Sequence, residues 1–243
     1  MKKSETLTQK STKVNQKVTK NEKKSQTLPK KEQKVLGIVI PYYKNSEQCE
    51  ICFKKLIEKI KNQLESNNNT IVLVVEDGQN SSWLNSYENE KIKVLRNKTN
   101  KGVSNARNKG IDYLMDKTNY IGFIDSDDDI ADDYIEKMSN YATDNTHDIL
   151  EANVNINGVF SSNNEPCKHR NSVWSYAFKT SVIGDKRFDE NLQYYEDTDF
   201  MYNIVDFNKH RKVNVPTTYF YIFGRNPNSL TKMYSENRIT KYR

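Results

Sequence analysis

A short apolar run that ends in a cluster of carboxylates constrains the fold of this chain more than any other stretch. The run, residues 120–124, reads Tyr-Ile-Gly-Phe-Ile and has no helical period, which predicts a buried strand. Four carboxylates follow it: Asp125, Asp127, Asp128 and Asp129. Carboxylates this close repel one another, and a divalent cation with oxygen ligands commonly stabilises such a cluster. We therefore expect Mg²⁺ or Mn²⁺, bridged to a substrate diphosphate, where the strand leaves the core.

Two other interpretations of the cluster stay open from the residues alone. One is a solvated helix start, because acids near a helix N-terminus are favoured and residues 131–138 have a helical pattern. The other is a calcium loop of the EF-hand type. Four acids stand at its positions one, three, five and twelve: Asp125, Asp127, Asp129 and Glu136. Against it, Ile130 stands where the loop requires Gly, and a strand precedes the loop.

The amino-terminal stretch differs in composition from the rest. Residues 1–34 carry eleven Lys and three Glu, so they account for the net charge of +6 and leave the remainder nearly neutral. With few aliphatic residues the stretch cannot bury enough apolar surface to order itself, and we predict a disordered Lys-rich tail. Its Lys residues have no aromatic neighbours, so we expect no nucleic-acid partner.

The chain shows no apolar run long enough for a signal peptide or a transmembrane helix. We therefore expect a cytoplasmic protein. Peripheral contact between the basic tail and the inner face of the membrane remains an open alternative. The oligomeric state is left open by the sequence.

Two of the three cysteines, Cys49 and Cys52, have the Cys-x-x-Cys spacing of redox motifs. They also lie on one apolar stripe with Phe53, Ile57 and Ile60, at helical spacing. Packing accounts for both, so we favour core cysteines. The remaining cysteine and the three histidines are scattered, and no zinc set is apparent.

Apolar runs and helical patterns alternate through the first half of the chain. Three strands are predicted: 35–40, ended by Pro41, then 71–75 and 92–95. Asn45 offers an N-cap for a helix after the first strand, and residues 100–115 form a second amphipathic pattern. This alternation predicts an α/β fold with a mostly parallel, Rossmann-like sheet, in which polar residues at the carboxyl ends of the strands line one crevice. Residues 148–158 instead alternate apolar and polar side chains, as a half-exposed strand would.

Several residues of that crevice have two readings each. Asp77 could accept the imide N–H of a uracil ring or cap the turn at Gly78. Arg107 could hold phosphate oxygens or brace the acid cluster. Glu196 and Asp197 could simply cap a helix, but a second acid group facing an electrophile bound by the first suits a general base.

Five motifs in this order resemble the family-2 inverting glycosyltransferases, whose fold is of the GT-A type. The resemblance covers most of residues 35–235. It rests on these stretches: Val39-Ile40-Pro41-Tyr42-Tyr43, Glu76-Asp77-Gly78, Asn100 to Gly110, Asp125-Ser126-Asp127-Asp128 and Glu196-Asp197. It implies a metal-dependent enzyme that moves a sugar from a nucleotide-sugar, foremost a UDP-sugar, to a hydroxyl of a glycan or glycoconjugate acceptor. We expect the protein to act in bacterial or phage-encoded surface-glycan or glycoconjugate synthesis.

The resemblance also implies a role for each matched residue. Asp127 would hold Mn²⁺ or Mg²⁺, and Asp197, beside Glu196, would be the catalytic base. The donor would be bound by five residues: Pro41, Tyr43, Asp77 at the base, Arg107 at the base or diphosphate, and Asp125 at the ribose. The segment 221–231 resembles one that closes over the donor diphosphate.

By the same resemblance, residues 35–235 form one domain, with a nucleotide-sugar-binding half over 35–130 and an acceptor half over 131–235. Residues 236–243 are a C-terminal extension. The acceptor loops are expected within 155–173.

The chain departs from the family pattern in two places: Gln79-Asn80 follows Gly78, and no His stands in the C-terminal segment to complete a metal shell. Two other functions remain as alternatives. A sugar-phosphate nucleotidyltransferase would normally have a Gly-rich basic loop after its first strand, and residues 41–45 are not one. A catalytically inactive binding module with a nucleic-acid-docking tail is the second.

Overall fold

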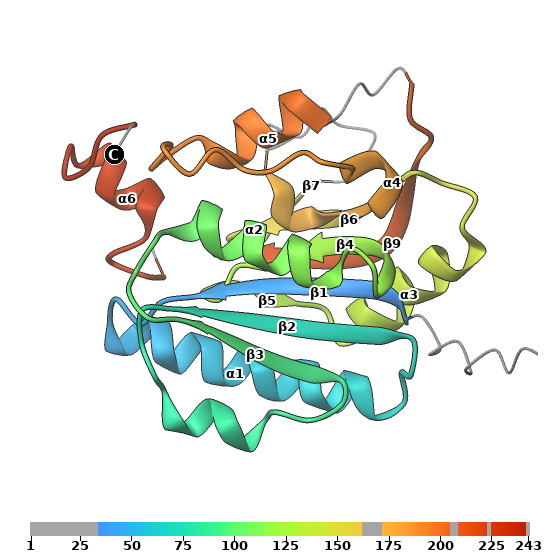
Figure 1. Ribbon diagram of the computed structural model, residues 1–243, viewed down its shortest axis with the longest axis horizontal. Helices are drawn as coiled ribbons and strands as arrows, with labels where there is room; N and C mark the ends of the chain where they lie inside the picture. Colours follow the sequence, from blue (N-terminus) through green and yellow to red (C-terminus); the bar gives the residue numbers. More distant parts are fainter. Residues whose placement is uncertain (1–33, 162–171, 205–208, 223–224, 242–243) are drawn as a thin grey trace, which may run out of the picture. The chain divides into compact units, whose positions relative to one another are not determined.

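The computed structural model describes residues 34–161, 172–204, 209–222 and 225–241, which are organised around a mixed sheet of nine strands (Figure 1). The strand order is β3-β2-β1-β4-β8-β6-β9-β5, and β7 pairs with β6 off this path. The strands are β1 Lys34–Tyr42, β2 Thr70–Asp77, β3 Ile92–Asn97, β4 Thr118–Phe123, β5 Asp129–Ile130, β6 Ile149–Ile156, β7 Val159–Ser161, β8 Tyr176–Lys179 and β9 Lys212–Tyr221. The α-helices are α1 Glu47–Glu65, α2 Val103–Leu114, α3 Tyr134–Asp144, α4 Thr180–Ile183, α5 Glu196–Ile204 and α6 Leu230–Ser235. Short 3₁₀ turns cover Ser82–Ser86 and Val173–Ser175.

Strands β1 to β4 form the parallel half of the sheet, as predicted. Side chains alternate along β1, so Ile38 and Ile40 pack in one core with α1 and α3, and Val39 packs in the other with α2 and α5. Figure 1 shows α1 and α2 on opposite sides of the sheet. Covering both faces explains why these strands are apolar throughout rather than alternating.

The other half of the sheet is mixed. Strand β8 runs antiparallel to both β4 and β6, β6 pairs with β9 in parallel, and β5 pairs with β9 in the antiparallel sense. The strand predicted at 148–158 is present as β6, but its half-exposed character is wrong, because β6 lies between β8 and β9 and most of its residues are buried. Two of its polar side chains, Glu151 and Asn155, are buried with partners. Glu151 accepts from Tyr176 at 2.7 Å and pairs with Lys212, and Asn155 accepts from the Gly158 N–H at 2.7 Å.

Three predicted boundaries also move. Strand β1 continues through Pro41, because its pairing with β4 has already ended at Val39, so the missing N–H of proline leaves no gap in that ladder. The N-cap of α1 is Ser46, whose hydroxyl accepts from the Cys49 N–H, and not Asn45. Helix α2 begins at Val103 rather than at residue 100.

Cys49 and Cys52 are both buried, with 2% and 1% of their surfaces exposed, and neither forms a disulfide. This confirms that they are core cysteines. The predicted tail up to residue 33 and most of the predicted acceptor loop at 155–173 lie outside the described residues. Within the described residues, no helix is both long and apolar enough to span a bilayer.

Close packing of α2 against β1 fixes the geometry of the crevice. A Cβ added to Gly110 would lie 2.4 Å from Cγ1 of Val39, closer than real carbon atoms approach. Glycine therefore lets the helix lie against the strand, with Arg107 one turn nearer its N-terminus. As a result, Arg107 faces the carboxyl end of the sheet.

Candidate active site

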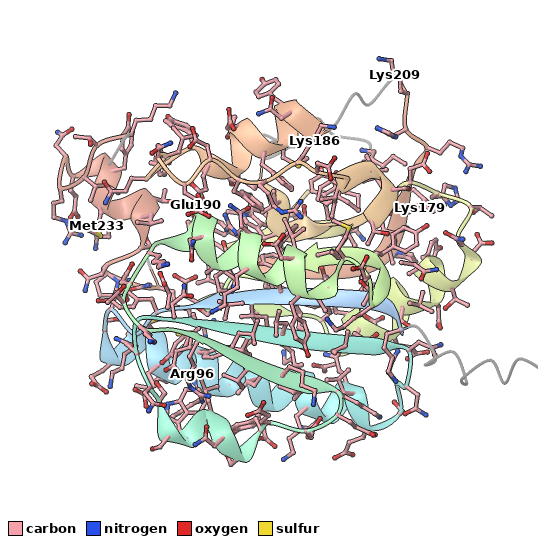
Figure 2. The ribbon with its side chains drawn as sticks, in the orientation of Figure 1. Arg96, Lys179, Lys186, Glu190, Lys209 and Met233 are labelled. Carbon is pink, nitrogen blue, oxygen red and sulfur yellow. The ribbon has the colours of Figure 1, made fainter. Side chains whose placement is uncertain are left out.

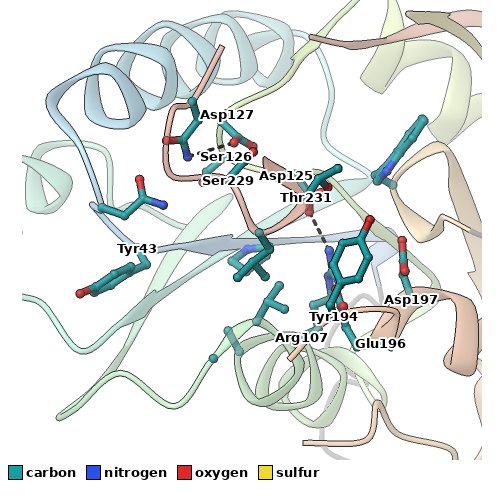
Figure 3. A pocket seen from close by; sticks show the side chains of 18 of the residues that line it. Tyr43, Arg107, Asp125, Ser126, Asp127, Tyr194, Glu196, Asp197, Ser229 and Thr231 are labelled. Atoms are coloured by element: carbon teal, nitrogen blue, oxygen red, sulfur yellow. Dashed lines mark hydrogen bonds and ion pairs between the residues drawn. The ribbon is translucent and has the colours of Figure 1, made fainter. Parts of the chain in front are cut away.

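A cavity of about 710 Å³ opens at the carboxyl ends of β1, β2 and β4 (Figure 3). All the site residues expected from the sequence line it: Pro41, Tyr43, Asp77, Arg107, Asp125, Asp127, Glu196 and Asp197. Loops after three parallel strands, helix α2 and the start of α5 thus converge on one space. This position, outside the carboxyl ends of parallel strands, is where open α/β sheets bind ligands.

Arg107 joins the two acid clusters. Its guanidinium donates to Asp125 at 2.9 Å and to Glu196 at 2.7 Å, and it is almost fully buried. The ring of Phe188 lies 5.3 Å from the guanidinium carbon. Of the two roles left open for Arg107, bracing the acids is the one that the structure shows. A buried arginine with two carboxylate partners holds α2, the β4 loop and α5 in a fixed relation.

Asp197 differs from its neighbour Glu196. In the part of the chain that the structure describes, Asp197 forms no ion pair, and one of its oxygens accepts from the Thr198 N–H at 2.8 Å. Burial, followed by the charge of Glu196, raises the pKa of Asp197 to about 7. A carboxylate with such a pKa can take up a proton near neutral pH.

Hydrogen bonds to α2 hold the loop that leads into α5. Glu190 accepts from the side chains of Asn105 at 2.9 Å and Asn108 at 3.0 Å, and Figure 2 shows it beside α2. Asn108 also accepts from the Phe188 N–H at 2.7 Å. These contacts place the loop before α5, and with it Glu196, against the helix that carries Arg107.

The four carboxylates after β4 have four different surroundings. Asp125 pairs with Arg107, whereas Asp129 pairs with Lys59 of α1 at 2.9 Å. Asp128 is buried, and it accepts from the Tyr219 hydroxyl at 2.7 Å and from the Ile222 N–H at 3.2 Å. Asp127 lines the cavity. Both alternative readings are therefore wrong: Asp129 points to α1 and does not join a calcium shell, and α3 begins only at Tyr134.

Asp127 is the carboxylate best placed to hold a metal. Its partner is the side-chain amide of Asn226, with an N–O distance of 3.2 Å (Figure 3). A neutral amide leaves most of the lone pairs of the carboxylate available, and hard oxygen donors suit Mg²⁺ and Mn²⁺. The described residues contain no group of three or more acid, His or Cys side chains arranged to hold a metal ion. The donor set therefore fits an ion that completes its shell with phosphate oxygens and water.

Asp77 is occupied by protein donors. It accepts from the Asn97 side chain at 2.8 Å and from the backbone N–H groups of Lys101 and Gly102, the shortest at 2.7 Å. The carboxylate thus anchors the loop that leads into α2. Gly78 has a φ of +83°, and a Cβ there would lie 2.1 Å from the Asn100 nitrogen, so this turn requires glycine.

Residues from the end of the chain complete the cavity. Asn45 and Asn228 exchange side chain–backbone hydrogen bonds of 2.8 and 2.9 Å, which tie residues 226–229 to the loop before α1. The Tyr219 hydroxyl also accepts from the Asp125 N–H at 3.1 Å. No pattern in the sequence singles out Asn226, Asn228 or Tyr219 as site residues. Only the resemblance of residues 221–231 to a closing segment pointed to this region.

Several curated bacterial proteins resemble this chain, including the following two. One is the uncharacterized glycosyltransferase EpsJ of Bacillus subtilis, which is 26% identical over 82% of this chain and 63% of its own length. The other is the poly(ribitol-phosphate) β-N-acetylglucosaminyltransferase TarP of Staphylococcus aureus, 25% identical over 51% of this chain and 38% of its own length. The chain thus spans less than two thirds of the length of these relatives.

Solved structures share the fold. The TarS structure of S. aureus, residues 1–349, in complex with UDP-GlcNAc matches with a TM-score of 0.67 at 19% identity, over 81% of this chain and 60% of that one. A GalNAc-T7 structure with UDP, GalNAc and Mn²⁺ matches with a TM-score of 0.55 at 14% identity, over 80% and 45% of the two chains. These matches confirm the predicted GT-A-type fold.

The family assignment rests on a match between this chain and a sequence model of one family. The family model described as glycosyl transferase family 2 matches residues 37–228. That range runs from β1 to the segment beyond β9 and contains every residue that the sequence analysis placed in the site. The chain belongs to glycosyl transferase family 2.

Proposed function

We propose that this protein transfers a sugar from a UDP-sugar to an acceptor hydroxyl in a single displacement that inverts the anomeric carbon. The observation that carries the proposal is the contrast between the adjacent acids at the start of α5: Arg107 neutralises Glu196, and Asp197 is left as a carboxylate with a raised pKa on the cavity wall. A group of this kind suits proton removal from an acceptor hydroxyl. In support, a structural neighbour binds UDP-GlcNAc and a relative is named as an N-acetylglucosaminyltransferase.

In the proposed reaction, Asp197 takes the proton of the acceptor hydroxyl. The acceptor oxygen forms a bond to the anomeric carbon, and the bond from that carbon to the diphosphate breaks, so UDP leaves with the electron pair. Arg107 holds Glu196 and Asp125 in place through this step and keeps the charge of the acid pair balanced.

Asp127, with phosphate oxygens of the donor, would hold Mn²⁺ or Mg²⁺, and the ion would stabilise the charge of the leaving diphosphate. Mn²⁺ is present in the related GalNAc-T7 structure. Pro41, Tyr43 and Asp77 are proposed to lie at the nucleoside end of the donor, and Asp125 at its ribose. Since both oxygens of Asp77 accept from protein donors, we propose that it acts mainly by holding the loop around the base.

The acceptor is proposed to be a glycan or glycoconjugate, and no nucleic acid is expected. A role at the cytoplasmic face of the membrane, with the Lys-rich residues 1–33 in contact with anionic lipid, is part of the same proposal. Flotation of the full chain with vesicles containing phosphatidylglycerol, compared with a chain lacking these residues, tests it. Equal flotation of the two chains would exclude the contact.

Thermal unfolding in the presence of a panel of nucleotide sugars and Mn²⁺ tests the donor assignment, because a ligand bound only by the native state raises the melting temperature. UDP-sugars should raise the melting temperature of the wild type, and Asp127→Ala or excess chelator should remove most of that rise. Asp132→Ala, on an exposed carboxylate outside the cavity, is the control. Undiminished turnover in excess chelator would exclude the metal role.

Two further assays distinguish the alternatives. A sugar-phosphate nucleotidyltransferase would release pyrophosphate from a nucleoside triphosphate and a sugar phosphate, which a phosphate-coupled assay detects. A binding module would bind no nucleotide sugar at all while the tail alone was retained on heparin.

A further inference from the structure

In the described part of the chain, two exposed aromatic side chains line the cavity. They lie at different ends of the cavity. They are Tyr43, with 41% of its surface exposed, and Tyr195, with 43% exposed. Figure 3 shows Tyr43 and Asp197 on opposite sides of the cavity. Tyr195 comes directly before the Glu196-Asp197 pair, so it lies at the end where the proposed base acts.

The backbone of Tyr195 has an unusual conformation. Its φ is +68°, in the left-handed region that side chains other than glycine and asparagine rarely adopt. Its carbonyl accepts from the Asp199 N–H at 3.0 Å, so the same residue begins the hydrogen bonding of α5. Strained backbone of this kind persists where the surrounding structure imposes it, and it is found preferentially at functional sites.

Two other tyrosines support the ring of Tyr195. Its centroid lies 4.4 Å from that of Tyr194 and 5.7 Å from that of Tyr234 on α6, while Tyr194 and Tyr234 stack on each other at 4.2 Å. The backbone N–H of Gln193 donates to the Lys241 carbonyl at 2.8 Å, which fixes the same loop to the end of the described chain. The ammonium nitrogen of Lys241 lies 5.9 Å from the centroid of the Tyr195 ring, and 43% of the Tyr195 surface remains exposed beside the acid pair. The ring is thus held by neighbours on several sides and still presents aromatic surface to the cavity.

A pyranose ring is the ligand that this surface fits. Its hydroxyl groups point outward around the ring, and its axial C–H groups form a flat apolar face that covers an aromatic ring closely. An aromatic side chain gives a large contact area at low cost in conformational entropy, because it has few rotatable bonds. An acyclic polyol phosphate, in contrast, has no flat C–H face to offer.

We propose that Tyr195 is a stacking platform for a pyranose ring of the acceptor and that it brings a hydroxyl of that ring to Asp197. This inference rests on the proposed function and adds the chemical class of the acceptor. The donor nucleotide is not the occupant, because its proposed contacts with Pro41, Tyr43 and Asp77 lie at the ends of β1 and β2. Tyr195 is thus a specificity-determining residue for the acceptor.

The test is saturation-transfer NMR with the methyl glycopyranosides of glucose, galactose, mannose and N-acetylglucosamine, and with ribitol 5-phosphate for comparison. At least one pyranoside should bind the wild type through its ring protons. Tyr195→Ala and Tyr195→Gly should weaken that binding by about tenfold or more, as expected for the loss of a central aromatic contact. Tyr195→Trp should retain it.

Two features of the design separate the ring from the backbone. Glycine adopts a φ of +68° without strain, so Tyr195→Gly removes the ring and keeps the fold. Tyr202→Ala is the matched control, because Tyr202 lies on α5, the helix that follows Tyr195, is 76% exposed and does not line the cavity. It should leave pyranoside binding unchanged.

Several results would overturn the proposal: no pyranoside bound by the wild type, binding that survives Tyr195→Gly, or Tyr195-dependent binding of ribitol 5-phosphate alone. A second readout is the KM of turnover with UDP-GlcNAc. Tyr195→Gly should raise the KM for the pyranoside about tenfold while changing the KM for the donor less than about twofold, and the opposite pattern would place the donor on Tyr195. Pyranoside binding through Tyr195 without binding of any nucleotide sugar would refute the proposed transferase and leave the saccharide site standing.

Discussion

Glu196 and Asp197 are adjacent carboxylates with different partners. The Glu196 side chain is buried and paired with Arg107 at 2.7 Å, whereas Asp197 keeps one oxygen free of the protein contacts that the structure records. Apart from the family resemblance, which favours Asp197, the residue pattern does not rank them, because both residues follow the same aromatic pair at the same helix start. The ion pair with a residue 89 positions away supplies the distinction.

Asp197→Asn should reduce transfer by about 10² to 10⁴-fold, because an amide cannot accept the acceptor proton. The fold and the affinity for UDP-sugar should be retained, and the two are measured by thermal unfolding and by titration of UDP-GlcNAc. Asp199→Asn, two residues further along in the same first turn of α5, is the control for a simple capping effect. Normal turnover by Asp197→Asn together with loss of turnover in Glu196→Gln would reverse the two roles.

The pH dependence of transfer follows from the same residue. Asp197 can accept a proton only as the carboxylate, and its pKa is raised to about 7 by burial and by Glu196. The carboxylate fraction therefore falls as the pH drops below 7, and kcat/KM should fall about tenfold per pH unit on the acidic side. A profile of kcat/KM from pH 5 to 9 measures this limb, and a flat profile down to pH 5 would contradict the assignment.

Arg107→Ala should be strongly destabilising, because it leaves two carboxylates without their cation at a largely buried position. Removing one partner of a buried ion pair costs about 3–5 kcal/mol. Urea denaturation of the variant measures the change in the free energy of unfolding. The control is Arg187→Ala, whose partner Asp112 is exposed, and there the loss should stay below about 1 kcal/mol. Equal losses in the two variants would show that the Arg107 network adds no stability.

At the scale of elements, the contact between α2 and β1 sets the position of Arg107. Gly110→Ala would place a Cβ 2.4 Å from Val39, and overpacking of this kind costs about 1–3 kcal/mol. Val39→Ala alone should also destabilise the protein, by leaving a cavity. The double variant should lose less free energy of unfolding than the sum of the two, because the smaller residue makes room for the added methyl group. Additive losses would show that α2 adjusts without pressing on β1.

The elements of the parallel half were predictable because their signal is local. Residues 71–75 form a β-branched run, and they lie in a strand with helices over both faces. The exposure of strand β6 was mispredicted, because Glu151 and Asn155 have polar side chains of the kind that usually face solvent. Their hydrogen-bond partners come from neighbouring strands and a following turn, and no pattern within the strand predicts these partners.

The acid cluster shows the same limit at the site. Its place at the end of β4 was predictable, but the partner of each carboxylate was not. Lys59 on α1, Tyr219 on β9 and Asn226 lie far from the cluster along the chain, and each contacts a different carboxylate of it. The family resemblance singled out Asp127, but the different partners of the four acids become visible only in the folded arrangement.

At the scale of the whole molecule, deletion of the Lys-rich residues before β1 tests the prediction that they form a tail. Strand β1 begins at Lys34, whose N–H donates to the Lys117 carbonyl at 3.1 Å, so deletion of residues 1–33 spares the sheet. That deletion should leave the melting temperature unchanged, since its composition offers little apolar surface to bury. Deletion through residue 36 is the control, because it removes the buried Leu36 and should lower the melting temperature. A large loss in the shorter deletion would show that the tail contributes to the fold.

Strand β9 lies between β6 and β5, and the residues that it holds in place are far away in sequence: Tyr219 reaches Asp128 across 91 positions, and Asn226 reaches Asp127 across 99. Closing loops of this length costs entropy before any contact repays it, so pairings of this kind are slow to form. Refolding should therefore regain helical circular dichroism well before it regains binding of UDP-GlcNAc. Transferase competence would be the last property that the polypeptide acquires.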